Sequence, residues 1–203
     1  MTALALQNRV LSFWFHGTFD KVAAGTPLVF RMEWFQRSDE LDRQIRDNFQ
    51  ADLEQVVEKG QYVQELRGSP KGVLSLIILM DQFSRNIYRN SPLAFKADPK
   101  ALTLAKLAVT KKWDLELHPI ERTFAYMPFE HSEAMEDQKV AVQKFTEMAK
   151  ANPSIEALKM GHDYAIKHLE VIEKFGRFPH RNQVLGRTST EEELKYLADG
   201  GGF

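Results

Sequence analysis

The sequence of 203 residues predicts an all-α fold, and three observations support this prediction. Apolar residues recur every three or four positions over long stretches, as they do on one face of a helix. Prolines that follow a polar residue, and isolated glycines, stand where helices would begin and end. No stretch alternates between apolar and polar residues for the length of a strand. We therefore expect about seven to nine helices joined by short loops.

The first clear helical pattern lies between Ser38 and Gly60. Ser38 can accept a hydrogen bond from the first turn, and Gly60 can take the left-handed conformation that ends a helix. The apolar residues of this segment follow a helical spacing: Leu41, Ile45, Phe49, Leu53 and Val56. Before it, the region from Ala23 to Leu28 predicts an irregular loop.

A second helix is expected to begin at Ser69-Pro70, a helix cap followed by a first-turn proline. Asp98-Pro99 and His118-Pro119 predict two further helix starts of the same kind. The helix from Pro70 is apolar on all sides, which is typical of a helix in the centre of a bundle. Its apolar residues are Val73, Leu74, Leu76, Ile77, Ile78, Leu79, Met80 and Phe83.

Asp81 and Arg85 interrupt the apolar character of this central helix. They stand four residues apart with the acid first, which is the favourable order for an ion pair on a helix. Burying charge is costly unless the charge is paired, so we expect the two side chains to interact. The pair either holds Arg85 ready for an anionic ligand or fixes the packing of the helices.

Another helix is expected to run on from Pro128, with His131 and Gln138 in core-facing positions. Glu133 and Asp137 lie on its flank, four residues apart, and would repel each other. The helix dipole accounts for an acid in the first turn, but less well for Asp137. The alternative is a cationic partner across a cleft, either an arginine or a metal ion.

The segment from Ser154 to Phe175 predicts a helix with His162 in the middle of its apolar stripe. A histidine in this position is more often part of a core than a ligand. His168 lies off the stripe. Gly176 is expected to end the helix.

After Gly176 the chain becomes locally basic, with the sequence Arg177-Phe178-Pro179-His180-Arg181-Asn182 followed by Leu185-Gly186-Arg187. Such a loop suits an anion or a cluster of carboxylates, although it could also be a solvated turn whose arginines cap helices. We expect Arg177 or Arg181 to lie within salt-bridge range of Glu133 or Asp137. Ser189 or Thr190, with Glu192 or Glu193, predicts a capping box for a last helix.

Composition narrows the classes of function. The net charge of −1 gives no electrostatic signature of nucleic-acid binding, and no apolar run is long enough for a membrane span. The absence of cysteine excludes disulfides and fits a cytoplasmic protein, and the first residues do not resemble a signal peptide. The spacing of histidines and acids matches no established metal motif, so neither a metal nor a cofactor is expected. We expect one domain over residues 1–198 and a flexible glycine-rich tail over residues 199–203.

Four segments of the chain resemble an uncharacterised, mainly bacterial family catalogued as domain of unknown function 924. They read VLSFWF at residues 10–15, DQFSRNIYR at 81–89, PFEHSE at 128–133 with Asp137-Gln138, and FGRFPHRN at 175–182 followed by LGR. Ser84 stands where the family commonly has proline. The resemblance implies a tetratricopeptide-like arrangement, with antiparallel helix pairs in a right-handed superhelix. It supplies no known reaction.

Two functions remain open. In the first, the polar motif residues form one cleft that binds a small anionic molecule, with metal-free acid–base catalysis by His131, Glu133 and His180. The ligand-binding candidates are Arg85, Asn86, Gln138, Arg177, Arg181 and Asn182, and the orienting candidates are Asp81, Gln82, Asp137 and His168. In the second, the protein is an interaction module for a protein or peptide, and these residues only lock the helices together. Whether the chain is an enzyme is left open.

Overall fold

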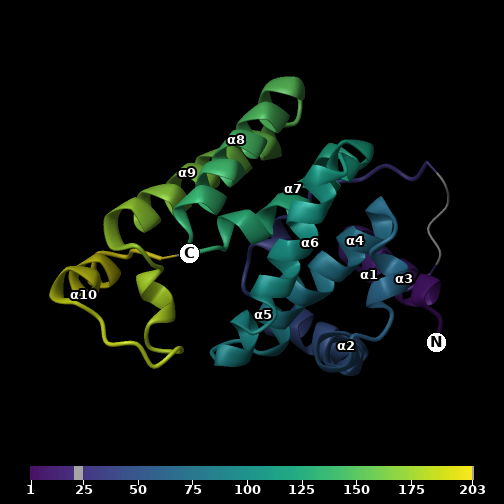
Figure 1. The fold of residues 1–203 in the computed structure, drawn as a ribbon, viewed down its shortest axis with the longest axis horizontal. Coiled ribbons are helices and arrows are strands. Elements are labelled where there is room, and N and C mark those ends of the chain that lie inside the picture. The colour runs from purple at the N-terminus through teal and green to yellow at the C-terminus, as the bar shows by residue number, and fades with distance from the viewer. Residues whose placement is uncertain (21–24, 203) are drawn as a thin grey trace. The chain divides into compact units, whose positions relative to one another are not determined.

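The structure is a computed structural model that describes residues 1–20 and 25–202 (Figure 1). Helices form the architecture of this described part, which contains no strand. The α-helices are α1 (Ala3–His16), α2 (Asp39–Lys59), α3 (Val63–Leu66), α4 (Pro70–Ile77), α5 (Ser84–Ile87), α6 (Asp98–Thr110), α7 (Pro119–Glu130), α8 (Met135–Ala151), α9 (Glu156–Phe175) and α10 (Glu191–Ala198). A π-helical turn, η2 (Ile78–Phe83), joins α4 to α5, and short 3₁₀ turns occur at η1 (Met32–Trp34), η3 (Pro92–Phe95), η4 (Trp113–Glu116) and η5 (Pro179–Arg181).

The all-α prediction is confirmed. With α4, η2 and α5 taken as one continuous helix, the described residues form nine α-helical elements, within the expected range. None of the helices in the described ranges has both the length and the apolar character needed to cross a membrane. The irregular loop expected at residues 23–28 falls partly outside the described residues, and its described part, residues 25–28, is non-helical. The superhelical arrangement stays a prediction.

The chain divides into two compact units. The first comprises Met1–Arg89 and Leu93–Pro128, and the second comprises Asn90–Pro92 and Phe129–Phe203. The helix α7 therefore ends in the second unit. The expectations of a single domain over residues 1–198 and of a flexible tail after it stay predictions.

The core of the first unit is the helix predicted to be central. Leu76, Ile77, Leu79 and Phe83 are each fully buried, as expected. The helices α1, α2 and α6 pack around the continuous rod formed by α4, η2 and α5. Aromatic rings pack beside it, with the ring centroids of Phe49 and Phe83 4.6 Å apart.

Local capping rules account for several helix ends in the first unit. The hydroxyl of Ser38 accepts a hydrogen bond from the Leu41 N–H, and Ser69 caps α4 through the Gly72 N–H. Gly60 ends α2 in the left-handed conformation. The helix start predicted at Asp98-Pro99 is confirmed, but the predicted cap is wrong, because Ala97 and not Asp98 occupies the cap position of α6. The Asp98 carboxylate instead accepts hydrogen bonds from Arg85.

The second unit contains the helical hairpin of α8 and α9, which lie side by side (Figure 1). Gly176 ends α9 with φ of 68°, as predicted from its position. Thr190 and Glu193 form the expected capping box of α10.

Two predictions about this unit are wrong. The helix α7 ends at Glu130 and α8 begins at Met135, so His131 and Glu133 lie in a connecting loop and not on a helix face. The buried face of α9 also differs from the predicted stripe. It includes Ala165 and His168, whereas the side chain of His162 keeps 29% of its exposure. His168 is therefore a core residue.

Candidate functional site

The central helix of the first unit carries a buried ion-pair cluster. Nη1 of Arg85 lies 3.3 Å from Oδ1 of Asp81, whose side chain is fully buried. The same guanidinium binds both carboxylate oxygens of Asp98 at 3.0 Å. Nη1 also donates to the backbone carbonyl of Asp81. The expected pair thus has a second acid, Asp98, whose position before Pro99 predicts only a helix cap.

Neighbouring polar residues of this helix bind other parts of the first unit. Gln82 Nε2 donates to Asp81 Oδ2 at 2.6 Å and contacts the sulfur of Met127. Asn86 Nδ2 donates to Asp42 Oδ1, and Arg89 holds both oxygens of the same carboxylate. Burial raises the pKa of Asp42, but the hydrogen bonds from Arg89 and Asn86 outweigh it, so the pKa lies below its ordinary value.

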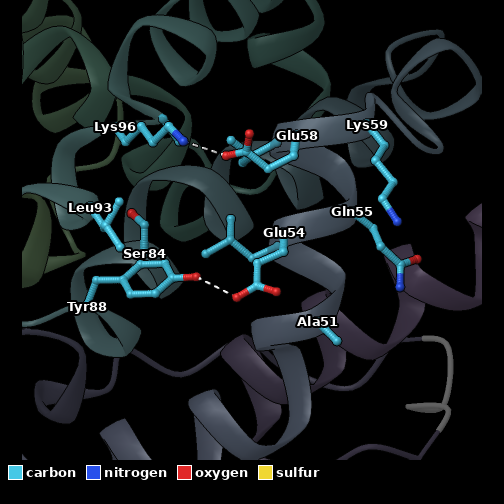
Figure 2. A pocket seen from close by; sticks show the side chains of 12 residues that line it. Ala51, Glu54, Gln55, Glu58, Lys59, Ser84, Tyr88, Leu93 and Lys96 are labelled. Carbon is cyan, nitrogen blue, oxygen red and sulfur yellow. Dashed lines mark hydrogen bonds and ion pairs between the residues drawn. The ribbon is translucent and has the colours of Figure 1, made fainter.

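A separate hollow of about 490 Å³ lies in the first unit beside α2 (Figure 2). Apolar and charged residues both line it, and two polar contacts join lining residues to each other. The Tyr88 hydroxyl donates to Glu54 at 3.1 Å, and Lys96 binds Glu58 at 2.7 Å. Burial, followed by the Glu54 carboxylate, raises the pKa of Tyr88 to about 12. None of the residues predicted to form a site lines this hollow.

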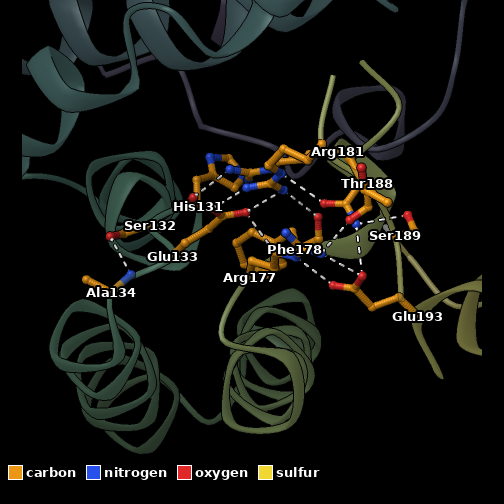
Figure 3. A network of polar contacts seen from close by, with 12 residues as sticks. His131, Ser132, Glu133, Ala134, Arg177, Phe178, Arg181, Thr188, Ser189 and Glu193 are labelled. Atoms are coloured by element: carbon orange, nitrogen blue, oxygen red, sulfur yellow. Dashed lines mark hydrogen bonds and ion pairs between the residues drawn. The ribbon is translucent and has the colours of Figure 1, made fainter. Parts of the chain in front are cut away.

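In the second unit, the arginine-rich loop meets the loop that carries His131 and Glu133 (Figure 3). Arg187 binds Glu133 through two parallel hydrogen bonds of 2.8 and 3.0 Å, a geometry that strengthens the pair. The Phe178 N–H also donates to Glu133 Oε1 at 2.8 Å. Burial alone would raise the pKa of Glu133, but the hydrogen bonds from Arg187 and Phe178 outweigh burial. The pKa therefore lies below its ordinary value, and the carboxylate stays ionised.

A second carboxylate, that of Glu193, also binds the arginine-rich loop. Arg177 binds both oxygens of Glu193, at 2.6 and 2.8 Å, and donates to the Thr188 carbonyl. The Thr190 N–H adds a hydrogen bond of 2.7 Å to the same carboxylate. These contacts, of which the Arg177 hydrogen bond is the strongest, lower the pKa of Glu193 to about 2.

Asn182 connects the two ion pairs. Its side-chain oxygen accepts from Arg187 Nε at 2.9 Å, and its Nδ2 donates to Glu193 and to Ser189. The residue is 1% exposed. We refer to Glu133, Arg177, Asn182, Arg187 and Glu193 as the carboxylate clasp.

Gln138 and Asp137 hold the loop between α7 and α8. Gln138 is fully buried on α8, and its Nε2 donates to the carbonyls of Glu130 and Ser132, both at 2.6 Å. Asp137 accepts a hydrogen bond from the Ser132 hydroxyl at 2.8 Å. Together these contacts fix the backbone on either side of His131.

Two imidazoles and one guanidinium pack on the ring of Phe178, and a third imidazole lies beside one of the two. The Phe178 ring centroid lies 5.5 Å from that of His168 and 5.6 Å from that of His180, and the Arg181 guanidinium lies 4.4 Å above it. His131 is placed beside them, with its ring 6.3 Å from His168 and its carbonyl accepting from Arg181. We refer to His131, His168, His180 and Arg181 as the imidazole cluster.

The histidines of the imidazole cluster have different charged neighbours. Nδ1 of His168 lies 3.0 Å from Glu130, and both side chains are nearly buried. Burial is the largest cause that lowers the pKa of His180 to about 4, and the positive charge of Arg181 follows it. His180 is therefore neutral at pH 7.

We expect His180 to contribute to the acid sensitivity of the fold. Because its pKa is depressed, the folded state binds fewer protons than the unfolded state between pH 6.5 and about 4. Stability is then full above pH 6.5 and falls by up to about 3 kcal/mol as the pH drops to 4. Urea unfolding at several pH values should show this slope reduced in His180→Asn. An identical slope in both proteins would contradict the prediction.

The structure gives no support for a metal centre. Within the described ranges, no group of three or more histidine, aspartate or glutamate side chains is arranged to hold a metal ion. We expect elemental analysis of protein purified without added metal to find no stoichiometric zinc, iron or manganese. One equivalent retained through dialysis against a chelator would contradict this expectation.

The structure brings together most of the predicted residues of the second unit. His131, Glu133, Arg177, His180, Arg181 and Asn182 all belong to one network with His168 beside it. The expected salt bridge to Glu133 is made by Arg187, while Arg177 pairs with Glu193. Arg187 and Glu193 were absent from the predicted site, although the LGR motif and the capping box had singled out both. The placement of Arg85 in the same cleft stays a prediction.

Comparison with known proteins places the chain in a family without an assigned activity. No curated protein matches the sequence. A solved structure of a protein of unknown function from Agrobacterium tumefaciens is similar, with 28% sequence identity and a TM-score of 0.78. The match covers 98% of this chain and 100% of the other. The family model for bacterial proteins of unknown function, DUF924, matches residues 10–201, so the chain belongs to the DUF924 family.

Proposed function

We propose that the protein binds a small anionic molecule at the imidazole cluster. The observation that carries this proposal is the packing of two imidazoles and the Arg181 guanidinium on one buried ring, Phe178, with the His131 imidazole beside them. Arg181 is 7% exposed, so its charge acts in a medium where electrostatic attraction is stronger than in water. A carboxylate or a phosphate ester would supply the complementary negative charge.

The carboxylate clasp and the imidazole cluster differ in the groups that surround their charged or titratable side chains. In the clasp, Glu133 and Glu193 each receive an arginine that binds both carboxylate oxygens. In the cluster, positive neighbours help to lower the pKa of His180. An anion bound there would oppose this effect. We therefore assign ligand binding to the cluster and support of its backbone to the clasp.

The state of His180 also supports acid–base chemistry. A neutral imidazole at pH 7 can accept a proton from a bound molecule, and the protonated form is stabilised by an adjacent anion. His131 and His168 lie beside it and can orient the ligand. This makes metal-free acid–base catalysis part of the proposal, with His180 as the proton acceptor. A cytoplasmic location stays a prediction.

The second candidate is a tetratricopeptide-like interaction module with a structural polar network. The clasp favours it, since Arg177 and Arg187 are engaged by acids of the same unit. In the first unit, the Arg85 guanidinium is likewise engaged by Asp81 and Asp98. Under this alternative, no small anion interacts with the imidazole cluster.

Titration with inorganic phosphate separates the two candidates. Histidine NMR signals of the wild type should report a pKa of His180 that rises when phosphate is added, and the melting temperature should rise by mass action. Arg181→Gln should lose both responses while remaining folded by circular dichroism. Arg37→Gln removes an arginine that is 68% exposed and should respond like the wild type.

Two outcomes of this titration would contradict ligand binding at the imidazole cluster. If millimolar phosphate and a dicarboxylate such as succinate both leave the His180 signals and the melting temperature unchanged, ligand binding at the cluster is wrong. The interaction module then becomes the better account. An equal response of wild type and Arg181→Gln would also overturn the assignment, because the anion would then bind elsewhere.

A further inference from the structure

The segment Gly200–Gly202 is held by the last turn of α10, mainly by Tyr196. The Gly201 N–H donates to the Tyr196 carbonyl at 2.9 Å, and the Gly202 N–H donates to the Tyr196 hydroxyl at 3.1 Å. Tyr196 itself packs on Phe175, with ring centroids 5.0 Å apart. After α10 ends, the segment therefore turns back and runs along the ring of Tyr196.

Glycine is required at two positions of this path. A Cβ atom on residue 201 would lie 2.4–2.5 Å from three carbons of the Tyr196 ring, closer than real atoms approach. Gly202 has φ of 120°, a conformation that residues with side chains rarely adopt. These two glycines let the backbone lie against the Tyr196 ring. They also allow the backbone to take many other conformations when it leaves the ring.

The path ends against His180 of the imidazole cluster. A Cβ atom on Gly202 would lie 3.3 Å from the His180 Cβ and 3.9 Å from its Nδ1, so the glycine backbone covers this edge of the imidazole. Nδ1 of His180 has no surface open to solvent. On its other sides, the imidazole faces the Phe178 ring and the charged or titratable groups Arg181, His168, His131 and Glu133.

We propose that Gly200–Gly202 is a strap that covers His180 and leaves it when an anionic ligand enters the imidazole cluster. This inference rests on the proposed function and adds to it a gate made by the chain itself. The attachment is weak because the three backbone N–H groups of the segment donate to just two adjacent residues at the end of α10, Tyr196 and Leu197, and because glycine gains more conformational freedom on release than any other residue. A hollow of about 510 Å³, lined by Tyr196, Lys195, Gly200 and Gly201, borders the strap and leaves space for it to move.

Two substitutions release the strap in different ways. Gly201→Ala places a methyl group where the Tyr196 ring stands, and Tyr196→Phe removes the hydroxyl that accepts from Gly202. Gly68→Ala is the control, because its Cβ would make only an ordinary contact of 3.4 Å in the first unit. In both release variants, NMR should show faster hydrogen exchange at the Gly202 amide. The pKa of His180 should rise from about 4 toward its ordinary value of 6.5, since less of the ring is desolvated.

Phosphate binding then tests the gate. If the closed strap blocks the site, the apparent dissociation constant is the intrinsic one divided by the open fraction, so Gly201→Ala should bind phosphate several-fold more tightly than the wild type. Unchanged exchange and an unchanged His180 pKa in both release variants would overturn the strap. Equal phosphate affinity in all proteins would overturn the gate but leave the proposed function standing. Binding by none of them would overturn both the gate and the proposed function.

Discussion

Truncating Leu76 or Leu79 to alanine is expected to lower the free energy of unfolding by about 2–5 kcal/mol. Both side chains are fully buried in the helix that forms the core of the first unit. Each truncation removes apolar surface from the core and leaves a cavity that a close-packed interior fills only in part. Urea unfolding followed by circular dichroism measures the loss directly.

Leu4→Ala is the matched control for these truncations. Its side chain lies on α1 of the same unit but is 62% exposed, so the change should stay within about 0.5 kcal/mol of the wild type. Losses close to that of the control at both Leu76 and Leu79 would show that the helix from Pro70 is not the core of the unit.

Replacing Glu193 with alanine is expected to cost about 3–5 kcal/mol, the range found when one partner of a buried ion pair is removed. Glu193 is 2% exposed and accepts hydrogen bonds from Arg177, Asn182 and Thr190. Its loss leaves the Arg177 guanidinium without its paired carboxylate, deprives the Asn182 amide of one acceptor, and removes the capping box of α10. Glu192→Ala is the control, because that neighbouring glutamate is 65% exposed and pairs only at the surface with Lys174.

The pH dependence gives an independent test of the same residue. The pKa of Glu193 is about 2 in the folded protein, against an ordinary value of 4.5 for the unfolded chain, so the folded protein binds fewer protons between these values. Its stabilisation is therefore complete above pH 4.5 and is lost as the pH falls toward 2. Glu193→Gln should flatten the acid limb of the stability profile. A limb as steep as that of the wild type would contradict the assignment.

The parts of the fold that depend on a few consecutive residues could be predicted from the sequence. Ser38, Gly60, Ser69 and Gly176 were expected at helix ends, and each lies at one. Capping is a local interaction between a side chain or a glycine and the nearest turn, so its signal stands in the sequence itself. The central helix was also predictable, because residues that are apolar on every side can be stabilised only in a core.

The break after Glu130 had no such local signal. No glycine or proline stands between Glu130 and Met135, and a helical spacing of three and four residues from His131 through Met135 to Gln138 continues across the gap. The chain turns because distant groups hold it. Gln138 binds the carbonyls of Glu130 and Ser132, and Glu133 is drawn to Arg187 and the Phe178 N–H. A helical period cannot report contacts of this kind.

The choice of ion-pair partners was also beyond the sequence. Arg177, Arg181 and Arg187 follow one another in the same loop, and their composition gives no reason to assign one of them to Glu133. In the folded loop, which contains the turn η5 and the left-handed Gly186, Arg187 binds Glu133 and Arg177 binds Glu193. Similarly, Asp98-Pro99 matched the pattern of a helix cap, and only the structure shows that its carboxylate binds Arg85.

The π-helical turn at Ile78–Phe83 has a consequence for how related sequences should be aligned. A π-helix holds an additional residue in its turn, and each residue rotates a helix by about 100°. Deleting one residue among positions 78–80 would restore an unbroken α-helix and keep Asp81 and Arg85 four apart. Because the π-turn takes up its additional residue locally, the helix that follows would keep its orientation, and Arg85 would stay opposite Asp98. A one-residue gap at this turn in a related sequence is therefore compatible with the same ion pair, and an alignment should place such a gap inside residues 78–83.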